Sequence, residues 1–203
     1  TEEFSQYIHD NILLTQKLLK ILHRKFIFIS TIDVYQKNDV LHCEDEEIDS
    51  NKIQGVYAFT KYVSEVFIQK TSPQWTILRC SALLGEDARK SSILRILKEK
   101  KPTVTVSADS EFNYVLHKDL LKIIVYLIRS NAQGIYNCCS KENIALSEIA
   151  KKLDKKVTFG EYCYKTGKID NSKLRKIIPE FEKTSLQVIE EFIQMKKNED
   201  TKQ

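Results

Sequence analysis

Two short runs of β-favouring residues constrain the fold of this chain more than any other feature. Phe26–Ile29 and Trp75–Arg79 are mostly apolar, and such runs suit strands that are buried on both faces of a parallel sheet. Apolar residues recur at helical spacing before the first run, over Tyr7–Leu22, and between the two runs, over Val56–Lys70. Helix, strand, helix, strand is typical of right-handed βαβ layers. The sequence therefore predicts an α/β protein.

The elements expected after Gly85 are shorter. The charged residues 196–203 are expected to form a frayed tail. Residues 39–55 are polar and are expected to form a long loop with an acidic patch at Glu44–Glu47. The apolar patterns predict helices at 93–100, 120–128, 146–153 and 186–195, and strands at 102–106, 114–116 and 134–138.

Composition excludes several classes of protein. The 203 residues include 42% hydrophobic and 30% charged side chains, which suits a globular core and excludes general disorder. The net charge is +4, but lysine-rich stretches such as Lys151–Lys156 contain acidic residues, so they indicate solvated helix faces rather than a nucleic-acid surface. No apolar run is long enough to span a membrane. We therefore expect neither nucleic acid nor a membrane as a partner.

The cysteines and histidines favour a reducing, cytoplasmic location and no metal. The five cysteines form no C-x-x-C pair, and adjacent Cys138 and Cys139 are unsuited to a disulfide. The histidines lack zinc-site spacing, and the neighbouring His42 and Cys43 are better explained as a coincidence within a loop. No signal peptide is evident. The chain opens in a helical pattern without a methionine, which we interpret as a fragment, a recombinant piece or a processed product.

Tyr57 and Lys61 form a candidate catalytic pair. They lie four residues apart at the start of the expected 56–70 helix, so they share one face, one turn apart. A tyrosine hydroxyl loses its proton at about pH 10, and a neighbouring cation favours the phenolate, which suits acid/base catalysis. The spacing alone is a weak signal, because both residue types are common on helix surfaces.

Hydroxyl residues at two strand ends strengthen this interpretation. Ser30 and Thr31 follow the first buried run, and Ser81 follows the second. In open parallel sheets, ligands bind outside the carboxyl ends of the strands. We therefore expect these hydroxyl groups and the Tyr57 helix to meet at one crevice.

Further motifs occur in a fixed order along nearly the whole chain. They are F-I-S-T-I-D-V-Y at 28–35, Y-A-F-T-K at 57–61, L-R-C-S-A-L-L-G at 78–85, N-Y-V-L-H-K-D at 113–119, G-I-Y-N at 134–137 and D-N-S-K-L at 170–174. With Asp10-Asn11 in the first helix, this set resembles the extended short-chain dehydrogenase/reductase family, which includes UDP-galactose 4-epimerase and related dehydratases and reductases.

The resemblance implies a fold and an activity. Residues 1–80 would be the C-terminal part of a Rossmann-type dinucleotide-binding domain with a partial parallel sheet. Residues 81–195 would be a small α/β substrate-binding lobe, interleaved with the last elements of that domain, and 196–203 a flexible tail. The activity would be an NAD- or NADP-dependent epimerisation, dehydration or reduction of a nucleotide sugar or a similar polyol or keto substrate.

The resemblance also implies residue roles. Tyr57 would be the acid/base for a sugar hydroxyl or keto oxygen, and Thr31 would orient the same oxygen. Lys61 would hold the nicotinamide ribose and lower the pKa of Tyr57. Asn11 would contact the cofactor, and Ser81 would line the nicotinamide.

Several positions depart from the family pattern. The five glycines lack the G-x-x-G-x-x-G spacing, so we expect an upstream segment or a partner chain to supply the phosphate loop, and the choice between NAD and NADP stays open. At the substrate-binding positions, Ala82 replaces an asparagine and Phe112 replaces an arginine that clamps a diphosphate. Gln36 replaces a glycine. Lys118 and Arg89 are candidates to replace the lost clamp.

Assembly and catalysis each leave an alternative open. The expected helices 7–22 and 56–70 carry apolar residues on more than one face, and the resemblance implies that they pair in a homodimer. Alternatively, some of these residues face the missing segment. A truncated, non-catalytic relative acting as a binding or regulatory module, or an unrelated α/β protein, are the alternatives to an enzyme. The apolar residues that lie on more than one face of the expected helices 7–22 and 56–70 include Ile8, Leu13, Phe59, Tyr62 and Phe67.

Overall fold

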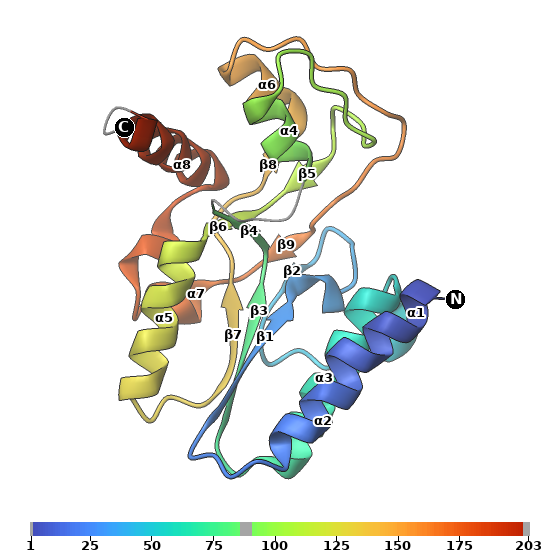
Figure 1. The fold of residues 1–203 in the computed structure, drawn as a ribbon, viewed down its shortest axis with the longest axis vertical. Coiled ribbons are helices and arrows are strands. Elements are labelled where there is room, and N and C mark those ends of the chain that lie inside the picture. Colours follow the sequence, from blue (N-terminus) through green and yellow to red (C-terminus); the bar gives the residue numbers. More distant parts are fainter. Residues whose placement is uncertain (1, 86–90, 201–203) are drawn as a thin grey trace.

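The computed structural model describes residues 2–85 and 91–200 of the chain. Strands and helices alternate over most of its length (Figure 1). The strands are β1 (Phe26–Thr31), β2 (Leu41–His42), β3 (Trp75–Cys80), β4 (Ala82–Leu84), β5 (Glu111–Phe112), β6 (Tyr114–Leu116), β7 (Gly134–Cys138), β8 (Ile144–Ala145) and β9 (Lys168–Ile169). The helices are α1 (Glu2–Tyr7), α2 (Leu14–Leu19), α3 (Val56–Thr71), α4 (Ser92–Lys98), α5 (His117–Arg129), α6 (Leu146–Lys152), α7 (Ser172–Arg175) and α8 (Ser185–Asp200), with a π-helical segment, η1 (Ile8–Leu13), and 3-10 turns η2 (Ile32–Val34), η3 (Ser50–Lys52) and η4 (Pro179–Glu182).

The central sheet is parallel and three-stranded, in the order β1-β3-β7. β1 pairs with β3 from Phe26 opposite Trp75 to Thr31 opposite Cys80. Ile77 of β3 has 0% of its surface exposed, as expected for a strand covered on both faces. The predicted α/β fold with a parallel sheet is confirmed. The carboxyl ends of the three strands consequently lie along one edge.

Helices cover both faces of this sheet. The continuous helical rod of α1, η1 and α2 lies beside α3 on one side, and α5 lies on the other (Figure 1). On the α5 side, Ile123 and Leu127 pack with Leu78 of β3 and Leu174 of α7 in one hydrophobic cluster. On the α3 side, the buried residues include polar ones, among them Thr60 and Ser64.

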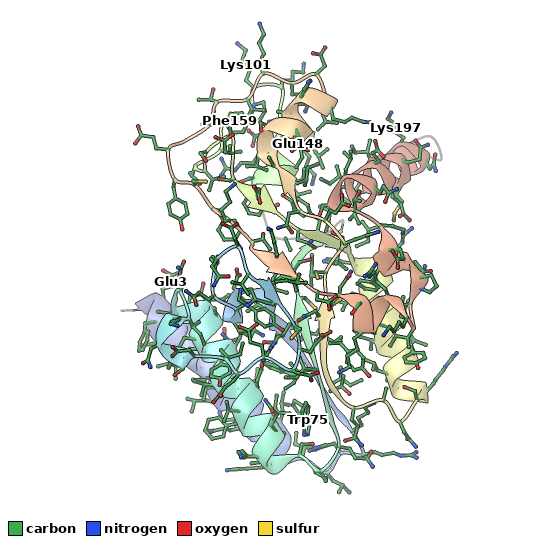
Figure 2. All side chains as sticks on the ribbon, turned by 180° about the vertical axis from the view of Figure 1, so that it is seen from behind. Glu3, Trp75, Lys101, Glu148, Phe159 and Lys197 are labelled. Atoms are coloured by element: carbon green, nitrogen blue, oxygen red, sulfur yellow. The ribbon has the colours of Figure 1, made fainter. Side chains whose placement is uncertain are left out.

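A small lobe stands at the carboxyl edge of the sheet. It consists of the parallel pair β4–β6, the antiparallel pair β5–β8, and helices α4, α6 and α8. Its core contains Ile96, Leu146 and Phe192. In Figure 2, Lys101 of this lobe lies at the opposite end of the molecule from Trp75, where β3 begins. The strand ends that were expected to carry the site therefore face the small lobe.

Several predicted boundaries are corrected. The first helix begins at Glu2 instead of Tyr7 and ends at Leu19. Its first turn contains Phe4 as its one apolar residue, which is too few for an apolar pattern to be recognised. Residues 102–106 form isolated bridges, Thr103 to Thr158 and Val106 to Tyr162, instead of a strand. The expected loop 39–55 contains β2, which pairs with β9.

The expected frayed tail from residue 196 is helical in the structure as far as residue 200. Residues 196–200 continue α8, since Lys, Asn and Glu extend a helix whose inner face already packs on the small lobe through Phe192 and Met195. Residues 201–203 lie outside the described part of the chain.

No helix within the described residues is long and apolar enough to cross a bilayer. All five cysteines are free thiols; Cys80, Cys138 and Cys139 are buried, whereas Cys43 and Cys163 are exposed. Burial raises the pKa of Cys138 and of Cys139, so these thiols behave as small apolar side chains.

Candidate active site

A cavity of about 470 Å³, here called the main cavity, opens at the carboxyl ends of β1 and β3, against the small lobe. It brings together predicted site residues from four separate parts of the sequence. Those that line it are Thr31, Tyr57, Ser81, Ala82 and Phe112. Asn11 and Lys61 do not line it. They line a second cavity of about 430 Å³ together with Tyr57, so Tyr57 borders both spaces.

Gly55 sets the start of the helix that carries Tyr57. It is the N-cap of α3 and has a φ of 86°, a left-handed conformation that glycine adopts readily. The chain can therefore turn sharply out of the preceding loop and place Tyr57 in the first turn of α3. The Tyr57 side chain is 38% exposed, which leaves it accessible to a ligand from solvent.

Thr31 is held by a local turn at the end of β1. Its Oγ1 accepts a hydrogen bond from the Asp33 backbone N–H at 3.1 Å and lies 3.2 Å from Asp33 Oδ2, to which the hydroxyl donates. The hydroxyl is thus fixed in position, although only 5% of Thr31 is exposed. A ligand oxygen would compete with the Asp33 carboxylate for the Thr31 proton.

Lys61 anchors α3 to the edge strand of the sheet. Its Nζ donates to the Ile29 carbonyl at 3.0 Å and lies 4.7 Å from the centroid of the Phe28 ring. Burial lowers the pKa of Lys61, while the nearby Cys80 and Glu65 oppose this effect. The ammonium is therefore positioned by backbone contacts, beside the cavity that Tyr57 also lines.

Asn11 lies in the π-helical segment η1, at the contact between the first helix and α3. Its Nδ2 donates to Thr60 Oγ1 at 2.9 Å, and its backbone carbonyl accepts a bond from Ser64 Oγ at 2.6 Å. Thr60 Oγ1 in turn donates to the Tyr57 carbonyl at 3.0 Å. π-helical turns often occur at functional sites. Here the segment connects the buried Asn11 to the turn that carries Tyr57.

Two buried hydroxyls that line the main cavity have no hydrogen-bond partner in the described structure. They belong to Ser30, which is 3% exposed, and Ser81, which is 7% exposed. Buried polar atoms normally find a partner, so an unpartnered hydroxyl at a cavity wall indicates a position where a ligand or water binds. Ser81 is therefore available for a ligand.

Sequence reasoning missed Asp33, Lys37 and Tyr164. The Tyr164 hydroxyl donates to Asp33 Oδ1 at 2.7 Å, and Lys37 Nζ lies 3.1 Å from the same carboxylate oxygen. Lys37 also lies 3.8 Å from the centroid of the Tyr164 ring. Burial and the charge of Asp33 raise the pKa of Tyr164, which keeps its hydroxyl a neutral donor. Asp33 stands inside a quoted motif, but no pattern distinguishes Tyr164.

Of the two predicted substitutes for a diphosphate clamp, Lys118 is the one that lies within the described residues. Phe112 stacks on Tyr164 with ring centroids 4.7 Å apart, and an aromatic ring offers no donor to a phosphate. Lys118 does not line the main cavity and forms an ion pair with Glu191 of α8. Arg89 lies outside the described residues. Within residues 2–85 and 91–200, no group of three or more His, Cys, Asp or Glu side chains is arranged to hold a metal ion.

Comparison with solved structures identifies a shared fold. The chain is 22% identical to a UDP-glucuronic acid 4-epimerase from Bacillus cereus solved with NAD, covering 88% of this chain and 64% of that one, less than two thirds of its length, with a TM-score of 0.70. It is 20% identical to a dTDP-4-dehydrorhamnose reductase from Bacillus anthracis solved with NADP, covering 86% and 68%, with a TM-score of 0.71. It is 18% identical to an NAD-dependent NDP-hexosamine 5,6-dehydratase of tunicamycin biosynthesis, covering 95% and 72%, with a TM-score of 0.75.

Comparison of the sequence with family models identifies the family. No curated protein matches the chain. The sequence model of the NAD dependent epimerase/dehydratase family matches residues 2–139, which include every predicted site residue. On this match and the fold, the chain belongs to the NAD-dependent epimerase/dehydratase family.

Proposed function

We propose that this chain carries the proton-transfer site of an NAD- or NADP-dependent epimerase, dehydratase or reductase that acts on a nucleotide sugar. The observation that carries this proposal is the arrangement around Tyr57. Thr31, Tyr57 and Ser81 line one cavity, and Lys61 and Asn11 line the adjoining one with the same Tyr57. A scaffold has no evident need for this set of polar groups at one strand edge.

The residues on the Tyr57 side fit the nicotinamide end of a dinucleotide. Ser81 supplies an unpartnered hydroxyl suited to a carboxamide, and Lys61 supplies a cation beside Tyr57 suited to ribose hydroxyls. The bound cofactor would supply hydride transfer. NAD and NADP are both candidate cofactors, because one of the similar structures was solved with NAD and another with NADP.

The protein's own residues would handle the proton. Tyr57 would give a proton to, or take one from, a substrate oxygen in the main cavity. Thr31 would turn its hydroxyl from Asp33 toward the same oxygen, while the Asp33 backbone N–H keeps Thr31 Oγ1 in place. Lys61, fixed on the Ile29 carbonyl, would favour the ionised form of Tyr57.

The reaction needs a phosphate-binding loop that these residues do not contain. No two of the five glycines are spaced as in the G-x-x-G-x-x-G motif of such a loop. We therefore propose that an upstream segment or a partner chain supplies the loop. We also propose a reducing, cytoplasmic location, consistent with five free thiols. A non-catalytic relative that binds a nucleotide sugar is the alternative, and the missing glycine motif favours it.

The test is turnover by the full-length protein with UDP-glucuronic acid, UDP-glucose and dTDP-4-dehydrorhamnose, each with NAD and with NADPH. We expect Tyr57→Phe to lower turnover by about a hundredfold or more while cofactor and substrate affinities change little. Tyr62→Phe is the matched control on the same helix, because among the described residues the Tyr62 hydroxyl bonds only the Ile48 carbonyl. Unaltered turnover in Tyr57→Phe would contradict the mechanism. A wild-type protein that binds a nucleotide sugar without turnover would support the non-catalytic alternative.

A further inference from the structure

The described lining of the main cavity contains few groups able to hold an anion. Its titratable side chains include Asp33, Tyr57, His117 and Tyr164. Asp33 already pairs with Lys37 and accepts the Tyr164 hydroxyl, so its charge is compensated. His117 is the member of this set that can become a cation. A negatively charged part of a substrate in the described cavity would therefore find its complement at His117.

His117 also stands where the backbone favours an anion. It is the first residue of the 13-residue helix α5, and the N-cap residue Leu116 gives no side-chain cap. The first backbone N–H groups of a helix have no partner within the helix, and the helix dipole adds positive potential there. Ser81, whose buried hydroxyl is unpartnered, lines the same cavity. A side-chain donor, a helix terminus and a free hydroxyl thus share one space.

The imidazole ring is held by a close contact with Gly85. A Cβ atom added at Gly85 would lie 2.2 Å from His117 Nδ1 and 2.6 Å from its Cγ. The ring therefore packs directly over the Gly85 backbone, and a side chain at position 85 would displace it. Within the described part of the chain, His117 makes no hydrogen bond or ion pair, so among these residues the contact with Gly85 is what positions the ring.

We propose that His117 recognises the diphosphate of the nucleotide-sugar substrate, in place of a clamp at Phe112; this inference rests on the proposed function. Phe112 is occupied by its stack with Tyr164, and Lys118 by its ion pair with Glu191. His117 is a positively chargeable donor on the cavity wall, and the N-terminus of α5 and Ser81 add neutral donors. The diphosphate oxygens would accept hydrogen bonds from these groups.

Calorimetric titration of the full-length protein with UDP and with uridine tests the proposal. Uridine keeps the base and ribose but lacks the phosphates. We expect His117→Ala to weaken UDP binding by about tenfold or more, the scale of a hydrogen bond to a charged group, and to change uridine binding by less than about twofold. His117→Gln keeps the side-chain volume and an N–H donor but cannot carry a charge, so it should show a smaller loss that is still selective for UDP. It guards against misfolding of the alanine variant.

Two further variants separate a local contact from a general charge effect. Gly85→Ala should weaken UDP binding as His117→Ala does, because it displaces the ring without removing it. Lys118→Ala removes the neighbouring cation outside the cavity and should leave UDP affinity unchanged.

The outcomes distinguish the two proposals. If the His117 variants weaken UDP binding and uridine binding equally, or weaken neither, the inference is wrong. Turnover of a nucleotide sugar would still support the proposed function. If the wild-type protein binds neither UDP nor dTDP and converts no nucleotide sugar, the inference fails together with the proposed function.

Discussion

Arg79 of β3 and Glu65 of α3 form an ion pair at 2.8 Å in which only 2% and 0% of the two side chains are exposed. Burial alone would lower the pKa of Arg79, but the charge and hydrogen bonds of Glu65 outweigh it and raise the pKa above its ordinary value. The guanidinium also donates to the Tyr35 hydroxyl at 2.9 Å. The pair therefore ties the helix that carries Tyr57 to the middle strand of the sheet.

Breaking this pair on one side should destabilise the fold strongly. Glu65→Gln leaves a buried charge on Arg79, and we expect the free energy of unfolding in urea to fall by about 3–5 kcal/mol. The double variant Glu65→Leu/Arg79→Met removes both charges and should be clearly more stable than Glu65→Gln. A single variant that unfolds at the wild-type urea concentration would show that the pair contributes little.

Lys61 should set the alkaline limit of activity. The proposed mechanism needs its ammonium form, which is lost as the pH rises through the pKa of Lys61. Because burial lowers this pKa, the loss should occur below the ordinary lysine value of about 10.4. Lys61→Arg keeps the charge, so whatever activity is left should persist to higher pH. The pH profile of kcat checks this, and an alkaline limb that does not move in Lys61→Arg would argue against a role for the Lys61 charge.

Glu191 should make stability depend on pH at the acidic end. Burial would raise the pKa of Glu191, but hydrogen bonds from Lys118 and Lys183 lower it overall. A carboxylate with a lowered folded-state pKa stabilises the protein above its unfolded pKa, and this contribution disappears as the pH falls through the folded value.

We accordingly expect Glu191→Gln to lower the free energy of unfolding by roughly 1 kcal/mol at pH 7, with a smaller difference below about pH 4. Urea titrations at several pH values measure this. Glu148→Gln on α6 is the control, since Glu148 has no ion pair among the described residues. If Glu191→Gln lowers the free energy of unfolding by the same amount at every pH, packing rather than charge explains the loss.

The outer helical face should be a contact surface of the full-length protein, and we expect a homodimer through it. Phe59 and Val66 of α3 are 43% and 39% exposed, and Leu14 and Leu18 of α2 are 43% and 42% exposed. Tyr62 is a poorer probe, because it packs against the buried cluster that contains Ile32 and Val34. Phe59→Glu should give a monomer in light scattering with unchanged circular dichroism.

The matched control for the dimer is Ile128→Glu, which places the same charge on an exposed apolar residue of α5, at 67% exposure. It should leave the mass unchanged. A wild-type protein that is monomeric at tens of micromolar would exclude the dimer, and the exposed residues would then face another segment.

The sequence predicted the parts of the site that follow from local pattern. Thr31 and Ser81 lie just past strongly β-favouring runs, and Tyr57 lies in the first turn of a helix with an apolar stripe, so their convergence at one sheet edge could be expected. The position of Tyr164 could not. It lies between α6 and β9 without a periodic pattern, and its place is fixed by the stack on Phe112 and the bond to Asp33.

Two other features escaped prediction for different physical reasons. The π-helical register of Ile8–Leu13 changes hydrogen bonding without changing the apolar pattern, so periodicity cannot reveal it. The strands β2, β5, β8 and β9 contain two residues each, which is too short for an alternation of side chains to be recognised. They are defined by the partners with which they pair, and these are distant in the sequence.

The pairing order of the central sheet has a consequence for how the protein folds. β1, β3 and β7 are neighbours in space but occupy residues 26–31, 75–80 and 134–138. Each pairing requires a long stretch of chain to close into a loop, which costs conformational entropy before the strands gain any contact. Domains dominated by such non-local contacts fold slowly, on the scale of about milliseconds to seconds. The main cavity also needs Tyr164 and Thr166, which arrive after β7. A chain in which these distant segments have not yet met therefore leaves its apolar strands exposed and has no main cavity.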